Sequence, residues 1–330
     1  MWTVHNDSQE CSGKRIYKTL LTLSACNETE FSCNGGDCVS MVKRCDGISN
    51  CRDGSDEIDC RMVVRMNGYN KFITPMHGGE QIPLRVNVSI NILDIIEINE
   101  VKDVFKVKID FTRGWFDNRL TFKNLKKHSP SLNNLLSDDI KSLWYPSVDI
   151  NNIEAETHFR KTSVQDTFKV VPNQDFKFTL SDMTYEKNVR LFMGSENGLH
   201  VTKQWSVTFI CHYNTMMYPF DTQLCRMEFL EGAGYSNMDL RPQQLYYNTA
   251  ISLNRYVLHH IKMCRSNVVK KQAIVIEVAL GRPLLSNVLT VFIPTTILLA
   301  ISYMSRVFQE EFLDMVIQVN LTVLLVQATL

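Results

Sequence analysis

Six cysteines lie within 35 consecutive residues near the start of the chain, at Cys26, Cys33, Cys38, Cys45, Cys51 and Cys60. A segment this short buries too little apolar surface to fold unaided, so it needs disulfide bonds. Their spacing alone leaves every pairing open. Acidic side chains crowd toward its end, at Asp46, Asp53, Asp56, Glu57 and Asp59. Because crowded carboxylates repel unless a hard cation binds them, residues 26–60 are predicted to form a disulfide-rich, calcium-binding module.

The cysteines also indicate the compartment, because seven of the ten fall in the first 60 residues, as in oxidised extracellular chains. Glycosylation sequons at Asn6, Asn27 and Asn87 agree with this. The 35 basic and 35 acidic side chains cancel, which argues against a nucleic-acid binder. No signal peptide is visible and the chain stops inside an apolar run. We therefore expect a fragment, cut at both ends, of a plasma-membrane protein with an extracellular N-terminal region.

The acidic module resembles the low-density-lipoprotein-receptor class A module, through Cys45-Asp-Gly and Asp53-Gly-Ser-Asp-Glu. The resemblance implies the disulfides Cys26–Cys38, Cys33–Cys51 and Cys45–Cys60. It also implies a Ca²⁺ site with side-chain ligands from Asp46, Asn50, Asp56 and Glu57 and carbonyl ligands from Lys43 and Ile48. Two positions depart from the family. Asn50 replaces an aspartate and removes one negative charge, and Lys43 stands where a tryptophan often anchors basic ligands.

The long middle part of the chain has a strand pattern. Residues 1–25 are too few to form a domain and are predicted to be the tail of a preceding region, and residues 61–82 are predicted to be a linker. From residue 83, apolar residues alternate at Val86, Val88, Ile90 and Ile92, and further short apolar runs follow. Many short strands joined by polar turns favour a β-sandwich over residues 83–282.

The last part of the chain has the composition of membrane helices. Leu284 to Tyr303 is a run of twenty residues without a charge, long enough to cross a bilayer, so residues 283–330 are predicted to hold one membrane helix and part of a second. On the second membrane helix, five residues are spaced by four, four, three and four positions, so they share one face of the helix. This stripe is formed by Asp314, Gln318, Thr322, Leu325 and Thr329. Such a stripe either packs against a neighbouring helix or lines an aqueous path.

A second resemblance starts from Cys211 and Cys225, which flank thirteen residues that include Pro219-Phe-Asp. This segment is similar to the signature loop of the Cys-loop, or pentameric ligand-gated, ion channels. Trp115-Phe-Asp-Asn-Arg-Leu, Leu143-Trp-Tyr-Pro and Arg282-Pro follow the family pattern in the expected order. The resemblance implies a disulfide between Cys211 and Cys225, four further subunits, a small-molecule agonist between subunits and a pore lined by the second membrane helix.

The same resemblance assigns roles to single residues. Asp221 and Arg282 would couple the sandwich to the membrane domain, although a surface ion pair between them would contribute little. A ring of Leu325 would form an apolar constriction, and a ring of Asp314 at the inner mouth would favour cations. The segment from Leu230 to Tyr235, in contrast, resembles the anion-selective branch.

The agonist region departs from the aromatic box of the family. Asp110, Asn151 and Ala233 stand where aromatic rings would attract an ammonium group. Phe111, Tyr235 and Tyr256 are the candidate aromatic contacts, and each also fits a place in the core. Cys264 lacks the adjacent cysteine that marks acetylcholine receptors.

We find no enzyme motif. The sequence predicts a mainly β extracellular sandwich with α-helical transmembrane segments, preceded by the disulfide-rich module, in a channel subunit. Two alternatives stay open: a Ca²⁺-dependent adhesion or endocytic receptor with an extracellular protein ligand on the module, and an auxiliary channel subunit that binds no agonist.

Overall fold

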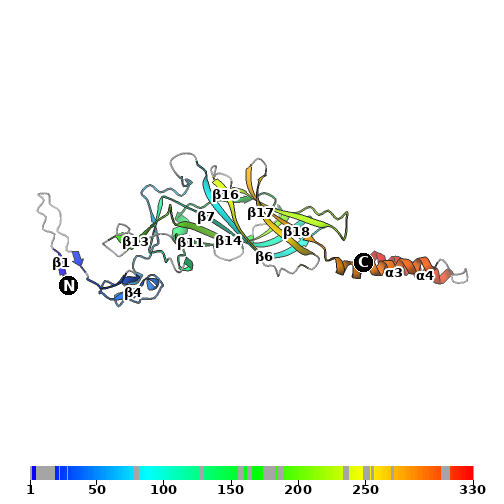
Figure 1. The fold of residues 1–330 in the computed structure, drawn as a ribbon, viewed down its shortest axis with the longest axis horizontal. Coiled ribbons are helices and arrows are strands. Elements are labelled where there is room, and N and C mark those ends of the chain that lie inside the picture. Colours follow the sequence, from blue (N-terminus) through cyan, green and yellow to red (C-terminus); the bar gives the residue numbers. More distant parts are fainter. Residues whose placement is uncertain are drawn as a thin grey trace.

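The computed structural model describes residues 2–4, 19–21, 23–27, 29–76, 82–126, 130–154, 160–161, 166–173, 183–184, 189–232, 238–247, 253, 256–268, 271–305 and 313–329. Asn6, Cys11 and Tyr235 lie outside these residues. Figure 1 shows an elongated molecule, with the N-terminal module at one end of a β-sandwich and two helices at the other. The long axis therefore separates the acidic module from the apolar C-terminal helices.

The sandwich is built from two main sheets. The larger has the strand order β10-β14-β7-β6-β16, and β11 also pairs with β14. Its strands are β6 (Leu84–Asn99), β7 (Val104–Trp115), β10 (Arg160–Lys161), β11 (Thr167–Val171), β14 (Gly198–Ile210) and β16 (Met238–Tyr247). The second sheet has the order β17-β18-β15-β9. Its strands are β9 (Val148–Ile150), β15 (Thr222–Glu231), β17 (Val257–Val268) and β18 (Lys271–Gly281).

The alternation in the sequence fixes which side chains fill the core. On β6, Val86, Val88, Ile90 and Ile92 are all buried, because residues two apart point to the same face of a sheet. The inward residues of both sheets meet through aromatic rings: the centroid of Phe111 lies 5.0 Å from that of Phe229 on β15. The prediction of a mainly β sandwich is confirmed.

A smaller sheet joins the module to the sandwich and corrects one boundary. It has the order β12-β13-β8-β5, formed by β5 (Val63–Arg65), β8 (Leu120–Lys123), β12 (Met183–Thr184) and β13 (Val189–Met193). Residues 61–82 were expected to be a linker, but β5 pairs with β8 and Tyr69 packs against the main core. Val63 and Val64 have β-branched side chains that favour a strand, but a strand of three residues depends on its pairing with β8.

Short elements complete the module and the N-terminal residues. The module contains β3 (Glu30–Ser32), β4 (Cys38–Ser40) and the 3-10 turns η1 (Met41–Lys43) and η2 (Ser55–Glu57). Before it, β1 (Trp2–Val4) pairs with β2 (Thr19–Leu21). In the sandwich, η3 (Pro130–Leu132) and α1 (Ser137–Ser142) lie between β8 and β9.

The C-terminal helices begin directly after β18. They are α2 (Leu284–Asn287), the π-helical turn η5 (Val288–Phe292), α3 (Ile293–Ser305) and α4 (Leu313–Thr329). A hydrogen bond between the side chains of Ser302 and Asn320 joins α3 to α4. Among the described residues, no helix combines the length and the apolar character that a membrane crossing requires.

Candidate functional site

Arg282 stands where the sandwich meets the first helix, and it binds two carboxylates. Its Nε donates to both oxygens of Asp221, at 2.8 and 3.0 Å. Its Nη1 and Nη2 donate to the two oxygens of Glu100, at 3.2 and 2.9 Å. Asp221 belongs to the loop closed by the Cys211–Cys225 disulfide, and Glu100 to the turn between β6 and β7. One guanidinium therefore connects three segments that lie far apart in the sequence.

This junction is buried, so it differs from a surface ion pair. The side chains of Arg282 and Asp221 are 6% and 3% exposed. Burial alone would lower the pKa of Arg282, but the hydrogen bonds to Glu100 and Asp221 raise it overall. For Asp221, burial would raise the pKa and the bond from Arg282 lowers it overall. Each charge is thus stabilised by its partner, and removal of one partner leaves the other buried without compensation.

Two tyrosine rings enclose the guanidinium. Its carbon lies 4.7 Å from the ring centroid of Tyr218 and 5.0 Å from that of Tyr256. Tyr256 is only 4% exposed. The expectation that Tyr256 contacts an agonist is therefore wrong, because its ring faces Arg282 inside the junction instead of a subunit surface.

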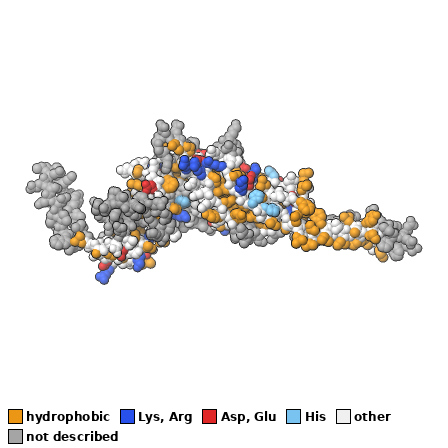
Figure 2. Space-filling model, in the orientation of Figure 1, with side chains coloured by type: hydrophobic (Ala, Val, Ile, Leu, Met, Phe, Trp, Pro, Cys, Tyr) orange, Lys and Arg blue, Asp and Glu red, His pale blue; other side chains and the backbone are white. Residues whose placement is uncertain are grey.

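The loop between Cys211 and Cys225 has a rigid base and an apolar tip. The Gln223 amide exchanges two hydrogen bonds of 2.8 Å with the backbone of Asn214, across the base of the loop. At the tip, Met216, Met217 and Phe220 are 90%, 72% and 69% exposed. Figure 2 shows hydrophobic side chains gathered where the sandwich meets the helices. The loop thus presents an apolar surface close to Arg282, just before the C-terminal helices.

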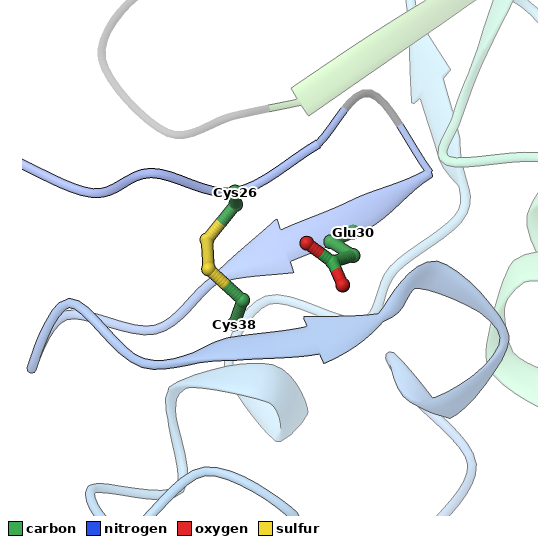
Figure 3. A group of neighbouring side chains, drawn as sticks. All are labelled: Cys26, Glu30 and Cys38. Atoms are coloured by element: carbon green, nitrogen blue, oxygen red, sulfur yellow. A yellow bond between two sulfur atoms is a disulfide. The ribbon is translucent and has the colours of Figure 1, made fainter.

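The module contains the three disulfides that its family resemblance implies: Cys26–Cys38, Cys33–Cys51 and Cys45–Cys60. Figure 3 shows Glu30 beside the Cys26–Cys38 bond. A second group is formed by Cys33, Cys51 and Asp53. In both groups, two sulfur atoms lie close to a carboxylate, as they would in a metal centre. Because the sulfurs are consumed in disulfides, no thiolate is left at either place to bind a metal ion.

Hydrogen bonds link several of the residues expected to bind Ca²⁺, although Asp46, Asp56 and Glu57 do not form, among the described residues, a group of three whose ligand atoms lie within 4.8 Å of one another. Asp46 Oδ1 accepts hydrogen bonds from the Ile48 backbone N–H, at 2.9 Å, and from Asn50 Nδ2, at 3.4 Å. Asn50 Nδ2 also donates to the Ile48 carbonyl, at 2.8 Å. The Glu57 carboxylate accepts from the backbone N–H groups of Asp46 and Gly47, at 3.0 and 3.2 Å. Asn50 thus points its amide nitrogen toward two of the expected ligands, and its amide must turn over before its oxygen can bind a cation.

Asp56 provides a direct test of whether a cation fits. It is fully buried, and its Oδ2 accepts a hydrogen bond of 2.6 Å from the Asn50 backbone N–H. Its other oxygen, Oδ1, is buried and accepts no hydrogen bond from the described residues. Burial raises the pKa of Asp56 and backbone hydrogen bonds lower it, with a net lowering, so the group is ionised at neutral pH. A buried, ionised oxygen of this kind fits a Ca²⁺ ligand.

The agonist region needs a second correction. Phe111 is fully buried and stacks between Trp205 and Phe229, so it cannot contact a ligand at a subunit surface. Its neighbours point the other way on β7. Asp110 accepts a hydrogen bond from Gln204 at 2.9 Å, and Thr112 bonds Thr202 at 2.8 Å.

On the second sheet, the Asn151 amide donates to Glu228 at 2.8 Å. Near Asp110, Thr112 and Asn151, the described side chains therefore form polar pairs instead of an aromatic box. Tyr235, the third aromatic candidate, lies outside the described residues.

Most of the predicted polar stripe can be followed on α4. Asp314 is exposed in the first turn, and Leu325 is 63% exposed. Thr322 donates to the Gln318 carbonyl at 2.7 Å. The side chain of Thr329 lies outside the described residues. Of the glycosylation candidates, Asn27 is exposed and Asn87 lies half-buried on β6.

Sequence reasoning missed Glu100, which shares Arg282 with Asp221. Glu100 and Arg282 are 182 residues apart in the sequence, and the turn that contains Glu100 has no motif that indicates a contact with Arg282. It also missed Lys126, on the segment after β8, which donates to a carbonyl of the module. Both contacts depend on how distant segments pack, which local patterns do not reveal.

Comparisons with known proteins agree with this architecture. Residues 61–273 match the neurotransmitter-gated ion-channel ligand binding domain, and residues 24–60 match the low-density lipoprotein receptor domain class A. The chain is 25% identical to the mouse gamma-aminobutyric acid receptor subunit pi over 302 residues, which are 88% of this chain and 59% of the relative.

Two more distant relatives show the same relation. The human gamma-aminobutyric acid receptor subunit rho-2 is 21% identical, with 82% of this chain and 54% of the relative covered. The Drosophila melanogaster glutamate-gated chloride channel is 22% identical, with 84% and 54% covered. The chain thus spans little more than half the length of these relatives. The sandwich, the disulfide-closed loop and the matched domains together establish that the chain belongs to the Cys-loop ligand-gated ion channel family and carries a low-density-lipoprotein-receptor class A module before its ligand-binding domain.

Proposed function

We propose that the chain is a subunit of a pentameric channel in the plasma membrane, opened by a small extracellular agonist at subunit interfaces of the sandwich. The observation that carries this proposal is the buried junction at Arg282, because it links the Cys211–Cys225 loop and the β6–β7 turn to the start of the helices. A displacement of either sheet reaches α2 through one guanidinium. Channel relatives, which are not enzymes, support the same function.

The helices are proposed to form the membrane part. Apolar side chains such as Leu285, Leu299 and Leu321 are 74%, 56% and 62% exposed, which suits contact with lipid or with neighbouring subunits. In a ring of five, the stripe on α4 would face the pore. Leu325 would narrow it, and Gln318, Thr322 and Thr329 would line it.

Asp314 supports cation selectivity, since a ring of carboxylates at a pore mouth attracts cations. A second candidate is anion selectivity, which is favoured by the relative named a glutamate-gated chloride channel. Asp314 acts directly on permeating ions, so we propose cation selectivity. The agonist is proposed to differ from acetylcholine, because Asp110 and Asn151 replace the rings of a cation–π cage.

The module is proposed to bind Ca²⁺ outside the cell through Asp46, Asn50, Asp56 and Glu57, with the carbonyls of Lys43 and Ile48. Bound Ca²⁺ would supply positive charge that neutralises these carboxylates. The chain itself preorganises them: the disulfides hold the loop closed, and backbone N–H groups orient Asp56 and Glu57. Asn27 and Asn87 stay candidates for glycosylation on the extracellular side.

Expression of the full-length protein in oocytes, with a panel of transmitters and pH steps, tests the channel function. We expect an agonist-evoked current, and no acetylcholine current from homomers. Asp314→Ala should reduce cation preference, and a reversal potential that follows chloride in the unmodified channel would overturn cation selectivity in favour of the second candidate. No current alone, together with an altered current from a co-expressed subunit, would indicate the auxiliary role instead. No effect in either assay would favour an adhesion receptor.

A further inference from the structure

One face of the module is in contact with the sandwich of the same chain. Lys126, just after β8, donates from Nζ to the Val42 carbonyl of the module at 2.9 Å. Lys123, at the end of β8, forms an ion pair with Asp59 of the module at 2.9 Å. A cavity of about 140 Å³ lies between the two parts, with both lysines, Asp59 and Cys60 in its lining. Two lysines of the channel domain thus contact the module, Lys126 at a backbone carbonyl and Lys123 at Asp59.

Lys126 is held in this position by the core of the sandwich. Asn133 is fully buried, and its side chain bonds both the N–H and the carbonyl of Lys126, at 2.8 and 3.1 Å. A buried side chain that fixes both backbone groups of one residue leaves little freedom for that residue to move away. The lysine is therefore presented to the module from a rigid base.

The Lys126 contact is adjacent to the expected Ca²⁺ ligands. Val42 precedes Lys43, whose carbonyl is one of those ligands. Burial lowers the pKa of Lys126, and the charges of Asp46 and Glu57, two more of the expected ligands, act in the opposite direction. Because Lys126 bonds a carbonyl that is not itself a ligand, it takes no oxygen away from a bound cation.

The charges of the site match this arrangement. Asp46, Asp56 and Glu57 carry three negative charges, and the asparagine at position 50 adds none. Ca²⁺ supplies two positive charges, so one negative charge remains on this ligand set near Lys126 when the ion is bound. Without Ca²⁺, the carboxylates repel one another, and the segment that contains Val42 and Lys43 loses the ion that orders it.

We propose that the module is docked on the sandwich of its own chain through Lys123 and Lys126, and that Ca²⁺ binding and this docking strengthen one another. The proposal rests on the Ca²⁺ binding proposed above. By linkage, whatever Ca²⁺ adds to docking, docking adds to Ca²⁺ affinity. The module then binds β8, a strand of the ligand-binding domain, in a Ca²⁺-dependent manner. It is not a freely moving binding domain for other proteins.

Hydrogen exchange on the purified full-length protein, with millimolar Ca²⁺ or with a chelator, tests the proposal without using channel activity. Protection of residues 41–57 reports Ca²⁺ binding, and protection of residues 120–126 reports docking. We expect Ca²⁺ to slow exchange in both segments. In Lys126→Met, the response of 120–126 should disappear, and the Ca²⁺ concentration that half-protects 41–57 should rise about fivefold.

Asp59→Asn probes the same interface from the module side, so the test holds even if the lysine variant fails to fold, and it should also weaken the response of 120–126. Lys141→Met, on an exposed residue of α1, is the matched control and should behave as the unmodified protein. A response of 41–57 with an unchanged or lower Ca²⁺ midpoint in Lys126→Met and Asp59→Asn would overturn the docking proposal and leave the Ca²⁺ site intact. No response of 41–57 would overturn the Ca²⁺ site itself.

Discussion

At the scale of single residues, Arg282 shows how strongly a buried charge depends on its partners. Its partners are Asp221, which the sequence motif identifies, and Glu100, which it does not. The three charged groups leave the junction with one excess negative charge, and the rings of Tyr218 and Tyr256 lie against the guanidinium. The junction therefore depends on every partner being present.

Replacing Arg282 with Gln should destabilise the protein by about 3–5 kcal/mol, because it leaves Asp221 buried without a counter-ion. The measurement is the thermal or denaturant midpoint of the full-length protein. Arg226→Gln is the control, since Arg226 pairs with Glu277 at a site where its side chain is 54% exposed. That exposed pair should contribute about 1 kcal/mol or less. Equal effects of the two substitutions would contradict the account of the junction.

The residue scale also shows what the sequence could predict. Phe105, Val107, Ile109 and Phe111 share one parity on β7, and all point into the core. The same alternation that predicted the strand could therefore have excluded Phe111 as a ligand contact, because it assigns Asp110 to the outer face. Glu100 and Lys126 could not be found in this way, since their partners come from distant segments. The position of Tyr256 beside Arg282 likewise depends on packing.

At the scale of elements, the turn before β8 is locked to the end of β13. Gly194 donates to the Leu120 carbonyl at 2.9 Å and accepts from the Asp117 N–H at 3.1 Å. Asp117 is buried and paired with Arg119 at 2.7 Å. The motif that starts at Trp115 therefore has a structural role, because it holds β8, the strand that also receives β5, in place.

Gly194→Ala should destabilise the protein by about 1–3 kcal/mol, the usual cost of forced overpacking. A Cβ at this position would clash with the Asp117 carbonyl oxygen and would lie 2.8 Å from that of Leu120, and backbone atoms cannot move aside without a cost in free energy. Gly35→Ala is the control, since its nearest neighbour would be 3.8 Å away. The measurement is the unfolding midpoint of each variant relative to the unmodified protein. An unchanged midpoint in Gly194→Ala would refute the prediction.

The stripe on α4 gives a second prediction at this scale. Leu325→Ser should raise spontaneous opening, because a ring of serines holds water where a ring of leucines repels it. The measurement is the agonist-independent current in oocytes. Ile317→Ser changes an exposed apolar residue of the same helix that lies off the stripe, so its resting current should stay near that of the unmodified channel. Equal resting currents would show that α4 does not present the stripe to the pore.

At the scale of the whole molecule, the chain joins a disulfide-rich module, a sandwich and C-terminal helices along one axis (Figure 1). The sequence predicted the disulfide-rich module and the mainly β sandwich that follows it. It misjudged residues 61–82, because a three-residue strand such as β5 is too short for its pattern to stand out and forms through pairing with β8. The disulfide pairing followed from resemblance, since spacing alone allows many alternatives.

The stability of the whole domain should fall as the pH drops from about 6.5 toward 4. Burial lowers the pKa of His200 to about 4, with a smaller contribution from Lys169. At a pH below the ordinary histidine pKa of about 6.5, His200 is protonated in the unfolded chain but stays neutral in the folded chain. The loss should be about 2 kcal/mol between pH 6.5 and 5, at about 1.4 kcal/mol for each unit.

Denaturant unfolding at pH 7 and pH 5 measures this loss. His200→Gln cannot take up a proton, so it should flatten the dependence on pH. His260→Gln, on the exposed side of β17, should keep the dependence of the unmodified protein. A His200→Gln protein with an unchanged dependence would show that another group is responsible.

The short connection between the module and β5 has a consequence for concentration. Only Arg61 and Met62 separate Cys60, which is fixed by a disulfide, from the first residue of β5. At about 3.5 Å per residue, such a tether keeps the module within about 10 Å of its attachment point. A module so confined meets its own sandwich at a millimolar-scale effective concentration, so a soluble competitor must bind far more tightly to displace it. In a ring of five subunits, five modules would be held on one rim, where a partner with several binding sites would gain avidity that no single module provides.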